Sequence, residues 1–294
     1  MTRHHLRVLL VPLVLLILTG PLIGCTTNAA TGHRQFNTLS RQQEIDMGKA
    51  AAPELAQQYG GPVPDASLQA YVRRVGMSMV PYVEGDYADL PWEFTLLDSD
   101  VINAFALPGG KVFITRGLAE KLDDEAEMAG VLGHEIGHVT AEHADKRVTS
   151  QSVAAGAAVL VGIATKDDDR DWVRIGAPML VGAGGQGFLL KFGRDEELEA
   201  DKLGMRYMTR AGYDPAGQLG VMQVLAKSSG GARQPEWMST HPYPGTRIKA
   251  IEKKLRNKYK DAKGERYRNR YQMEFLSKLA MAETPRAPVA EAKH

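Results

Sequence analysis

Apolar side chains recur with a helical period of three to four residues in several separate stretches of the chain. One stretch runs from Ala66 to Val80, and Pro81 is expected to end it. A second follows Asp124 and includes Val139. The apolar positions are Leu68, Tyr71, Val72, Val75 and Met79 in the first stretch, and Met128, Val131, Leu132, Ile136 and Val139 in the second. Both stretches are predicted to be amphipathic helices that bury one face.

Two of the expected helices begin at capping patterns. Ser40 is followed three residues later by Gln43, and Asp124 is followed by Glu127. In such a pair the first side chain accepts from a backbone amide of the first turn, and the second reaches back to the cap. Three further helices are expected, from Glu196 to Arg210, from Pro215 to Lys227 and, as the last of the chain, from near Thr246.

The region between these helices has the pattern of short strands. Phe94–Leu97 is predicted to be one strand. Ala104–Leu107 and Lys111–Thr115 are separated by Pro108-Gly109-Gly110, which predicts a β-hairpin. The expected fold class is therefore α+β, mainly helical with a small sheet.

Two apolar stretches, residues 153–164 and 173–190, leave alternatives open. The first is too short to span a membrane, and the second contains Arg174 and many glycines. They are either buried helices or a pair of loops that face a substrate or a membrane.

The first 25 residues resemble a bacterial lipoprotein signal. Arg3 and Arg7 precede an apolar segment from Leu9 to Leu18, and Cys25, the single cysteine of the chain, follows Leu22-Ile23-Gly24. Cleavage before Cys25 and acylation of its thiol are expected. The expected organisation is a signal peptide over 1–24, a polar tether over 25–39, one domain over 40–283 and a disordered tail over 284–294.

Composition narrows the class of protein. The 294 residues are 44% hydrophobic and 24% charged, which is typical of a globular chain, and the formal net charge is +1. A balance this close to zero gives no sign of nucleic-acid binding. One cysteine excludes an intramolecular disulfide.

The second helix carries the run His134-Glu135-Ile136-Gly137-His138, an H-E-x-x-H motif. Residues four apart lie on the same helix face, so both imidazoles can bind one Zn²⁺. Glu135 can then take a proton from a water molecule beside the metal.

A catalytic zinc site needs a third protein ligand. His143 falls on the opposite side if the helix continues, so it is interpreted as a surface histidine. The acidic run from Asp195 to Asp201 offers three glutamates. If Glu197 faces inward, its helix face also carries Ala200, Asp201 and Gly204, whereas Glu199 points toward solvent and Glu196 lies to one side.

These motifs together resemble the M48 metallopeptidases, and within them the periplasmic lipoprotein branch of BepA and LoiP, related to Ste24 and HtpX. The resembling segments are Asn103–Gly110, Gly133–Val139, Glu197–Asp201 and Thr240-His241-Pro242, which span roughly residues 40–255. The resemblance implies a gluzincin-type domain with its small sheet beside the active-site helix. It also implies Glu197 as the third ligand of one zinc ion per chain, and a proton-donating or orienting role for Asp201.

The resemblance leads to a functional hypothesis. The chain is expected to be a zinc endopeptidase that degrades misfolded or stalled envelope proteins, anchored by Cys25 to the outer membrane of a Gram-negative bacterium and working beside its assembly machinery. The edge Asn103, Ala104, Phe105 and Ala106 is expected to bind substrate as an added strand. His241 is expected to occupy the fourth zinc position and keep the enzyme latent. The alternative is a chaperone-like assembly factor with a latent zinc site.

Overall fold

A computed structural model describes residues 26–35, 39–148, 191–228, 235–242 and 244–282. Cys25, the expected signal peptide, the apolar stretches 153–164 and 173–190 and the expected tail lie outside these residues. No helix in the described ranges combines the length and the apolar character that a membrane span requires.

A three-stranded sheet stands at the centre of the fold. Strands β3 (Glu93–Leu97), β4 (Ala104–Leu107) and β5 (Lys111–Thr115) have the order β3-β5-β4. β3 pairs with β5 in parallel, and β4 pairs with β5 as the predicted antiparallel hairpin. Gly109, in the hairpin loop, has φ of +73°, and a Cβ there would lie 2.5 Å from Ile45 Cα. In this order β4 is an edge strand of the described sheet, and the hairpin loop packs tightly on the helix that contains Ile45.

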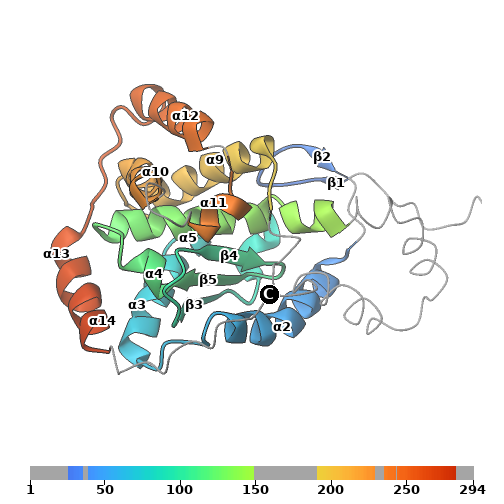
Figure 1. The fold of residues 1–294 in the computed structure, drawn as a ribbon. Helices are drawn as coiled ribbons and strands as arrows, with labels where there is room; N and C mark the ends of the chain where they lie inside the picture. The colour runs from blue at the N-terminus through green and yellow to red at the C-terminus, as the bar shows by residue number, and fades with distance from the viewer. Residues whose placement is uncertain (1–25, 36–38, 149–190, 229–234, 243, 283–294) are drawn as a thin grey trace, which may run out of the picture.

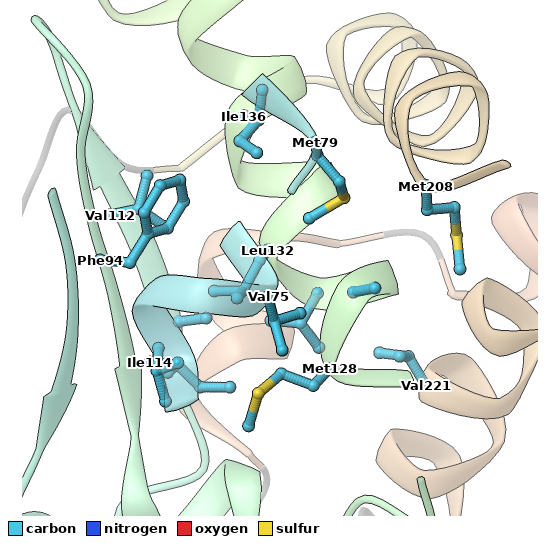
Figure 2. Close-up of a cluster of buried hydrophobic side chains, with 14 of the residues drawn as sticks. Val75, Met79, Phe94, Val112, Ile114, Met128, Leu132, Ile136, Met208 and Val221 are labelled. Carbon is cyan, nitrogen blue, oxygen red and sulfur yellow. The ribbon is translucent and has the colours of Figure 1, made fainter. Parts of the chain in front are cut away.

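Alternating side chains of the sheet contribute to two cores. Phe105 and Phe113 pack on one face against helix α2 (Arg41–Gln58). Phe94, Val112 and Ile114 lie on the other face, in one cluster with Val75, Leu132 and Ile136 (Figure 2). These last three belong to helices α3 (Ala66–Met77) and α5 (Glu125–Thr140). The sheet is therefore covered by helices on both faces, and α5 lies between it and the next helical layer (Figure 1).

That outer layer consists of later parts of the chain (Figure 1). Its helices are α9 (Arg194–Arg210), α10 (Ala216–Ser228) and α12 (Pro244–Asn257). The short helix α11 (Glu236–Thr240) lies closer to the sheet, because the Trp237 amide donates to the Ile102 carbonyl just before β4. The shorter elements are β1 (Thr26–Thr27), β2 (Arg34–Gln35), η1 (Val80–Tyr82), η2 (Gly85–Asp89), α4 (Arg116–Ala119), α13 (Arg268–Arg270), the π-helical turn η4 (Tyr271–Leu276) and α14 (Ser277–Met281).

The helices expected within the described residues are present, but several of them begin or end at other residues than predicted. Ser40 forms the predicted capping box with Gln43. The helix from Ala66 ends at Met77, and Pro81 lies in the 3₁₀ turn that follows. The prediction that the last helix starts near Thr246 is wrong, because helical structure resumes from Arg268 to Met281. Its buried side chains Tyr271, Phe275 and Leu279 are spaced four apart and pack into the main core.

Glycines allow α5 and α9 to cross at very short distance. A Cβ on Gly137 of α5 would lie 2.8 Å from the carbonyl oxygen of Ala200, and a Cβ on Gly204 of α9 would lie 2.8 Å from the backbone nitrogen of His134. Larger residues would force the helices apart. The small residues on the inward face of α9 thus bring its acidic side chains to the H-E-x-x-H helix.

Residues 26–35 differ from the free tether that the sequence predicts. They form the short antiparallel pair of β1 with β2, and Asn28 is buried. The Asn28 side chain donates to the Thr140 carbonyl at the end of α5 and to the Tyr87 hydroxyl. This segment therefore packs against the domain, because its asparagine satisfies a backbone group that the end of α5 leaves open.

Candidate metal centre

Helix α5 presents both histidines of the H-E-x-x-H motif on one buried face. Asp124 caps the helix through the backbone amide of Glu127. The Glu127 carboxylate accepts from the amide of Asp123 instead of completing the expected reciprocal bond with Asp124. His134 and His138 are fully or almost fully buried, and their Nε2 atoms lie 3.0 Å apart. The four-residue spacing therefore brings two imidazole nitrogens to one point.

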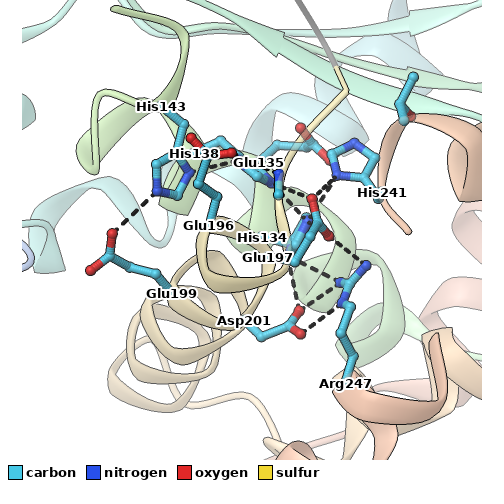
Figure 3. Close-up of polar contacts among 12 residues, drawn as sticks. His134, Glu135, His138, His143, Glu196, Glu197, Glu199, Asp201, His241 and Arg247 are labelled. Atoms are coloured by element: carbon cyan, nitrogen blue, oxygen red, sulfur yellow. Dashed lines mark hydrogen bonds and ion pairs between the residues drawn. The ribbon is translucent and has the colours of Figure 1, made fainter. Parts of the chain in front are cut away.

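Two residues from other elements face the same point (Figure 3). The Glu197 carboxylate of α9 lies 3.5 Å from His134 Nε2 and 3.5 Å from His138 Nε2. His241, the residue after α11, places Nδ1 3.0 Å from Glu197 Oε1 and 3.3 Å from His134 Nε2. The ligand atoms of these four residues all lie within 4.8 Å of one another, and all four residues are buried.

The donor set fits a metal ion on chemical grounds. Three imidazoles and one carboxylate are the nitrogen and oxygen donors that zinc prefers, and tetrahedral coordination needs four of them. His134, His138 and Glu197 therefore form a candidate metal site, and His241 lies close enough to be a fourth donor.

The Glu135 carboxylate lies beside this site. Both of its carboxylate oxygens are buried and lack a hydrogen bond among the described residues. The His241 Nε2 atom lies 3.6 Å from Glu135 Oε1. A buried carboxylate in this condition is typical of an active site, where the missing partner is a substrate or a water molecule.

Asp201 and Arg247 form a buried ion pair behind His134 (Figure 3). The Arg247 guanidinium donates from Nε and Nη2 to the two Asp201 oxygens over 2.8 and 2.7 Å, and its Nη1 lies 2.7 Å from Glu197 Oε2. Asp201 Oδ1 is also 2.9 Å from His134 Nδ1, the ring nitrogen that faces away from the centre. These contacts fit an orienting role for Asp201 better than proton donation, because both oxygens are already engaged.

The pKa values of these side chains follow from their contacts. Burial and the nearby Arg247 charge favour a neutral His134, yet its bonds with Asp201 and Glu197 raise the pKa of His134 to about 9. Burial holds the pKa of His138 well below the ordinary value. Burial alone would raise the pKa of Asp201, but Arg247 and His134 keep it well below its usual range. A proton on His134 must therefore leave when a metal binds.

The interpretation of His143 as a surface residue is wrong. His143 is fully buried, and its Nδ1 lies 2.8 Å from Nδ1 of His138. The helix does not continue to it, because Glu142 adopts φ of +55° just after α5 and turns the chain back. Glu199, which was expected to point to solvent, lies 3.2 Å from His143 Nε2 with its side chain only 15% exposed. Burial lowers the pKa of His143, so its ring is neutral.

Aromatic rings and a cation complete the walls of the site. Phe192 stacks on His138 with ring centroids 3.8 Å apart, and Trp237 stacks on His241 at 4.6 Å. The Arg247 guanidinium lies over the Trp237 ring at 4.6 Å. Sequence reasoning missed Phe192, Trp237 and Arg247. An indirect signal existed for Arg247 alone. Two carboxylates on the inward face of α9, Glu197 and Asp201, require a buried cation, but nothing in the sequence distinguishes Arg247 from the other arginines.

The predicted substrate edge lies next to the centre. β4 packs against α5, and Ala106 and Leu107 line a small pocket together with His138 and Phe192. The Asn103 side chain is held in place, because its amide donates to the Tyr59 hydroxyl and to the Glu236 carboxylate. The role of this edge in substrate binding stays a prediction.

The fold and the site together define a gluzincin-type metallopeptidase domain, in which an H-E-x-x-H helix meets a glutamate from a later helix. The chain belongs to peptidase family M48, whose family model matches residues 66–255.

Several characterised relatives match over most of this chain. The beta-barrel assembly-enhancing protease of Escherichia coli (strain K12) is 31% identical over 225 residues, which cover 72% of this chain and 44% of the relative. Its Yersinia pestis counterpart is 31% identical over 260 residues, covering 79% and 50%. The mitochondrial metalloendopeptidase OMA1 of Schizosaccharomyces pombe is 30% identical over 232 residues, covering 76% and 65%. The chain thus spans about half the length of the bacterial relatives.

Proposed function

We propose that this chain is a zinc-dependent endopeptidase of the bacterial cell envelope. The observation that carries the proposal is the convergence of His134, His138 and Glu197 on one buried point. The buried carboxylate of Glu135 lies beside it and accepts no hydrogen bond from the described residues. Membership of family M48 supports the same reaction class. His134, His138 and Glu197 would hold one Zn²⁺ per chain, and His241 is the candidate for the fourth position.

The chain's own residues supply the remaining steps of peptide hydrolysis. When bound, zinc supplies a Lewis acid that polarises the scissile carbonyl and makes a neighbouring water more acidic. Glu135 accepts the proton of the attacking water and delivers it to the amide nitrogen that leaves. Asp201 and Arg247 hold the His134 ring and the Glu197 carboxylate in place. Phe192 and Trp237 exclude bulk water from the imidazole faces.

Substrate would bind as an extended strand along the open side of β4. The Asn103 carbonyl accepts from the Thr115 amide of β5, so the antiparallel ladder turns the backbone groups of Ala104 and Ala106 toward the other side. The Ala104 amide is taken by the Asn103 side chain, which leaves Ala106 as the main pairing residue. Main-chain pairing tolerates many sequences, which suits a protease that acts on unfolded chains.

His241 would regulate the site as a removable fourth ligand. Its Nδ1 already lies 3.0 Å from Glu197 and 3.3 Å from His134, so it competes with water and substrate for the open position. Replacing His241 with alanine should raise the rate of proteolysis and lower the number of histidine ligands on zinc by one, because water can take the vacated position. The regulatory role fails if His241→Ala changes neither quantity.

The names of the bacterial relatives suggest the setting. They are called beta-barrel assembly-enhancing proteases, which supports misfolded or stalled envelope proteins as substrates and a link to the outer-membrane assembly machinery. The pattern before Cys25 supports a cleaved signal over 1–24 and a lipid anchor, with the catalytic domain over 40–283 in the periplasm at the outer membrane. Metabolic labelling with a palmitate analogue tests the anchor, because Cys25→Ser should abolish the label.

Cleavage of unfolded casein by the purified full chain tests the proposal. Wild type should produce fragments, a chelator should stop their formation, and added zinc should restore it. Glu135→Gln should bind zinc like wild type and leave casein intact, because the amide cannot accept the proton. Cleavage by a pure, zinc-loaded Glu135→Gln protein would refute the mechanism. Protection of casein from aggregation without any cleavage would favour the chaperone-like alternative instead.

A further inference from the structure

The polar contacts of His138 extend away from the proposed metal point through a second histidine to a carboxylate (Figure 3). His138 Nε2 faces His134 and Glu197, whereas its Nδ1 faces Nδ1 of His143 at 2.8 Å. His143 Nε2 in turn lies 3.2 Å from Glu199 Oε2. His138 lies on α5 and Glu199 on α9, the two helices that build the centre, and His143 follows the turn at the end of α5.

Metal binding would fix the position of every proton along this chain of contacts. A His138 ring that binds through Nε2 carries its proton on Nδ1, so the atom opposite must accept a hydrogen bond. His143 Nδ1 is then the acceptor, and the His143 proton must sit on Nε2. Glu199 accepts that proton's hydrogen bond, since an ionised carboxylate has only acceptors. One arrangement of protons therefore satisfies all three groups.

We infer that His143 is a positioning residue that orients His138 for metal binding, with Glu199 fixing the tautomer of His143. The inference rests on the proposed metal site. It gives each ligand histidine an outer partner on α9: Asp201 contacts His134 directly, and Glu199 reaches His138 through His143.

The backbone around His143 is arranged to hold this contact. Glu142 occupies the left-handed region of backbone conformation, at φ of +55°, which is unfavourable for every residue that carries a Cβ. Its carboxylate is held by the Tyr87 hydroxyl at 2.7 Å and by the Gln35 amide. These bonds keep the turn that brings His143 back under α5, although a continued helix would carry it to the opposite side.

Zinc affinity of the purified full chain, measured by competition with a chromophoric chelator, tests the inference. His143→Leu removes the acceptor at similar bulk and should weaken zinc binding about 10- to 100-fold. His143→Asn keeps an acceptor oxygen near the place of Nδ1 and should restore most of the affinity. His33→Ala is the matched control. It removes the exposed imidazole whose Nδ1 lies 3.2 Å from Glu199 Oε1, and it leaves the contact between His143 and Glu199 intact. It should bind zinc like wild type.

The thermal unfolding midpoint of each metal-free variant separates positioning from packing. Zinc affinity of His143→Leu equal to that of wild type would overturn the inference. Equal losses of zinc affinity in His143→Leu and His143→Asn, matched by equal losses of metal-free stability, would also overturn it. If His143→Leu does not fold, the pair Glu199→Leu and Glu199→Gln decides, since only glutamine still accepts from Nε2. If the wild-type protein does not bind one zinc ion per chain, the proposed function itself is refuted. This outcome is distinct from a result in which only the variants behave otherwise than expected.

Discussion

Arg247 offers a sharp test of how the centre is held together. It is fully buried and lies between the carboxylates of Glu197 and Asp201. Replacing it with methionine keeps most of the side-chain volume but removes the guanidinium that contacts both acids. The metal-free protein should therefore lose stability even though the core remains filled.

The magnitude follows from the three short contacts of the guanidinium, at 2.7 Å to Glu197 and at 2.7 and 2.8 Å to Asp201. Removing one partner of a buried ion pair costs about 3–5 kcal/mol, because the other charge stays buried without compensation. In a domain of this size about 1 kcal/mol shifts the unfolding midpoint by roughly 2–4 °C. Arg247→Met should lower the midpoint by about 6–20 °C.

Thermal unfolding of the full chain in excess chelator, followed by circular dichroism, measures this shift. Arg256→Met is the matched control, since Arg256 is 69% exposed and pairs with Glu252 on the surface at 3.6 Å. Its free energy of unfolding should change by less than about 1 kcal/mol. Adding Asp201→Asn to Arg247→Met should recover part of the loss, because one buried charge is then neutral. If Arg247→Met unfolds within 2 °C of wild type, the buried ion pairs do not hold the centre.

Three further predictions concern the helix crossing, acid stability and the metal. Gly137→Ala should destabilise the protein by about 1–3 kcal/mol and weaken zinc binding, because its Cβ meets the Ala200 carbonyl, whereas Gly245→Ala has free space and should be nearly neutral in denaturant unfolding. Burial opposes ionisation of Glu125, but bonds such as that from Arg270 lower its pKa below the ordinary 4.5. The ionised Glu125 therefore stabilises the fold above about pH 4.5, and this contribution is lost as the pH falls. From pH 5 to pH 3 wild type should lose more stability than Glu125→Gln, by at most about 1.4 kcal/mol per pH unit. Equal losses in the two proteins would contradict this. Zinc at 100 times its dissociation constant should raise the free energy of unfolding by about 2.7 kcal/mol over chelated protein, and an unchanged midpoint would contradict a specific site.

The parts of the fold that could be predicted depend on neighbouring residues alone. Ser40 caps its helix through Gln43, three residues away, and the hairpin loop needs only the glycines at 109 and 110. The inward face of α9 was also predictable, because Glu197, Ala200 and Gly204 share it by helical phase. Local spacing therefore indicated His134 and His138 directly and made Glu197 a candidate, which the family resemblance then selected.

His143 shows where spacing fails. The prediction carried the helix past Thr140 and placed His143 on the far side. The chain instead reverses at Glu142, whose left-handed backbone is stabilised by Tyr87, 55 residues away. A long-range contact that selects an unfavourable local conformation leaves no mark in the local pattern.

Arg247 and the C-terminal helical segment were missed for a related reason. Arg247 acts through carboxylates 46 and 50 positions earlier, and its own neighbourhood resembles an ordinary basic helix. The segment Arg268–Met281 is rich in charge and contains a π-helical turn, so its stripe of buried side chains has a period nearer four than 3.6. Interactions across the fold, rather than local preference, determine both features.

Anomalous diffraction at the zinc edge from crystals of the purified full chain tests the central claim most directly. We expect one peak per chain, within about 2.0–2.2 Å of His134 Nε2, His138 Nε2 and a Glu197 oxygen. A casein-cleaving protein whose crystals show no zinc at these three residues, or zinc held by other side chains, would contradict the account.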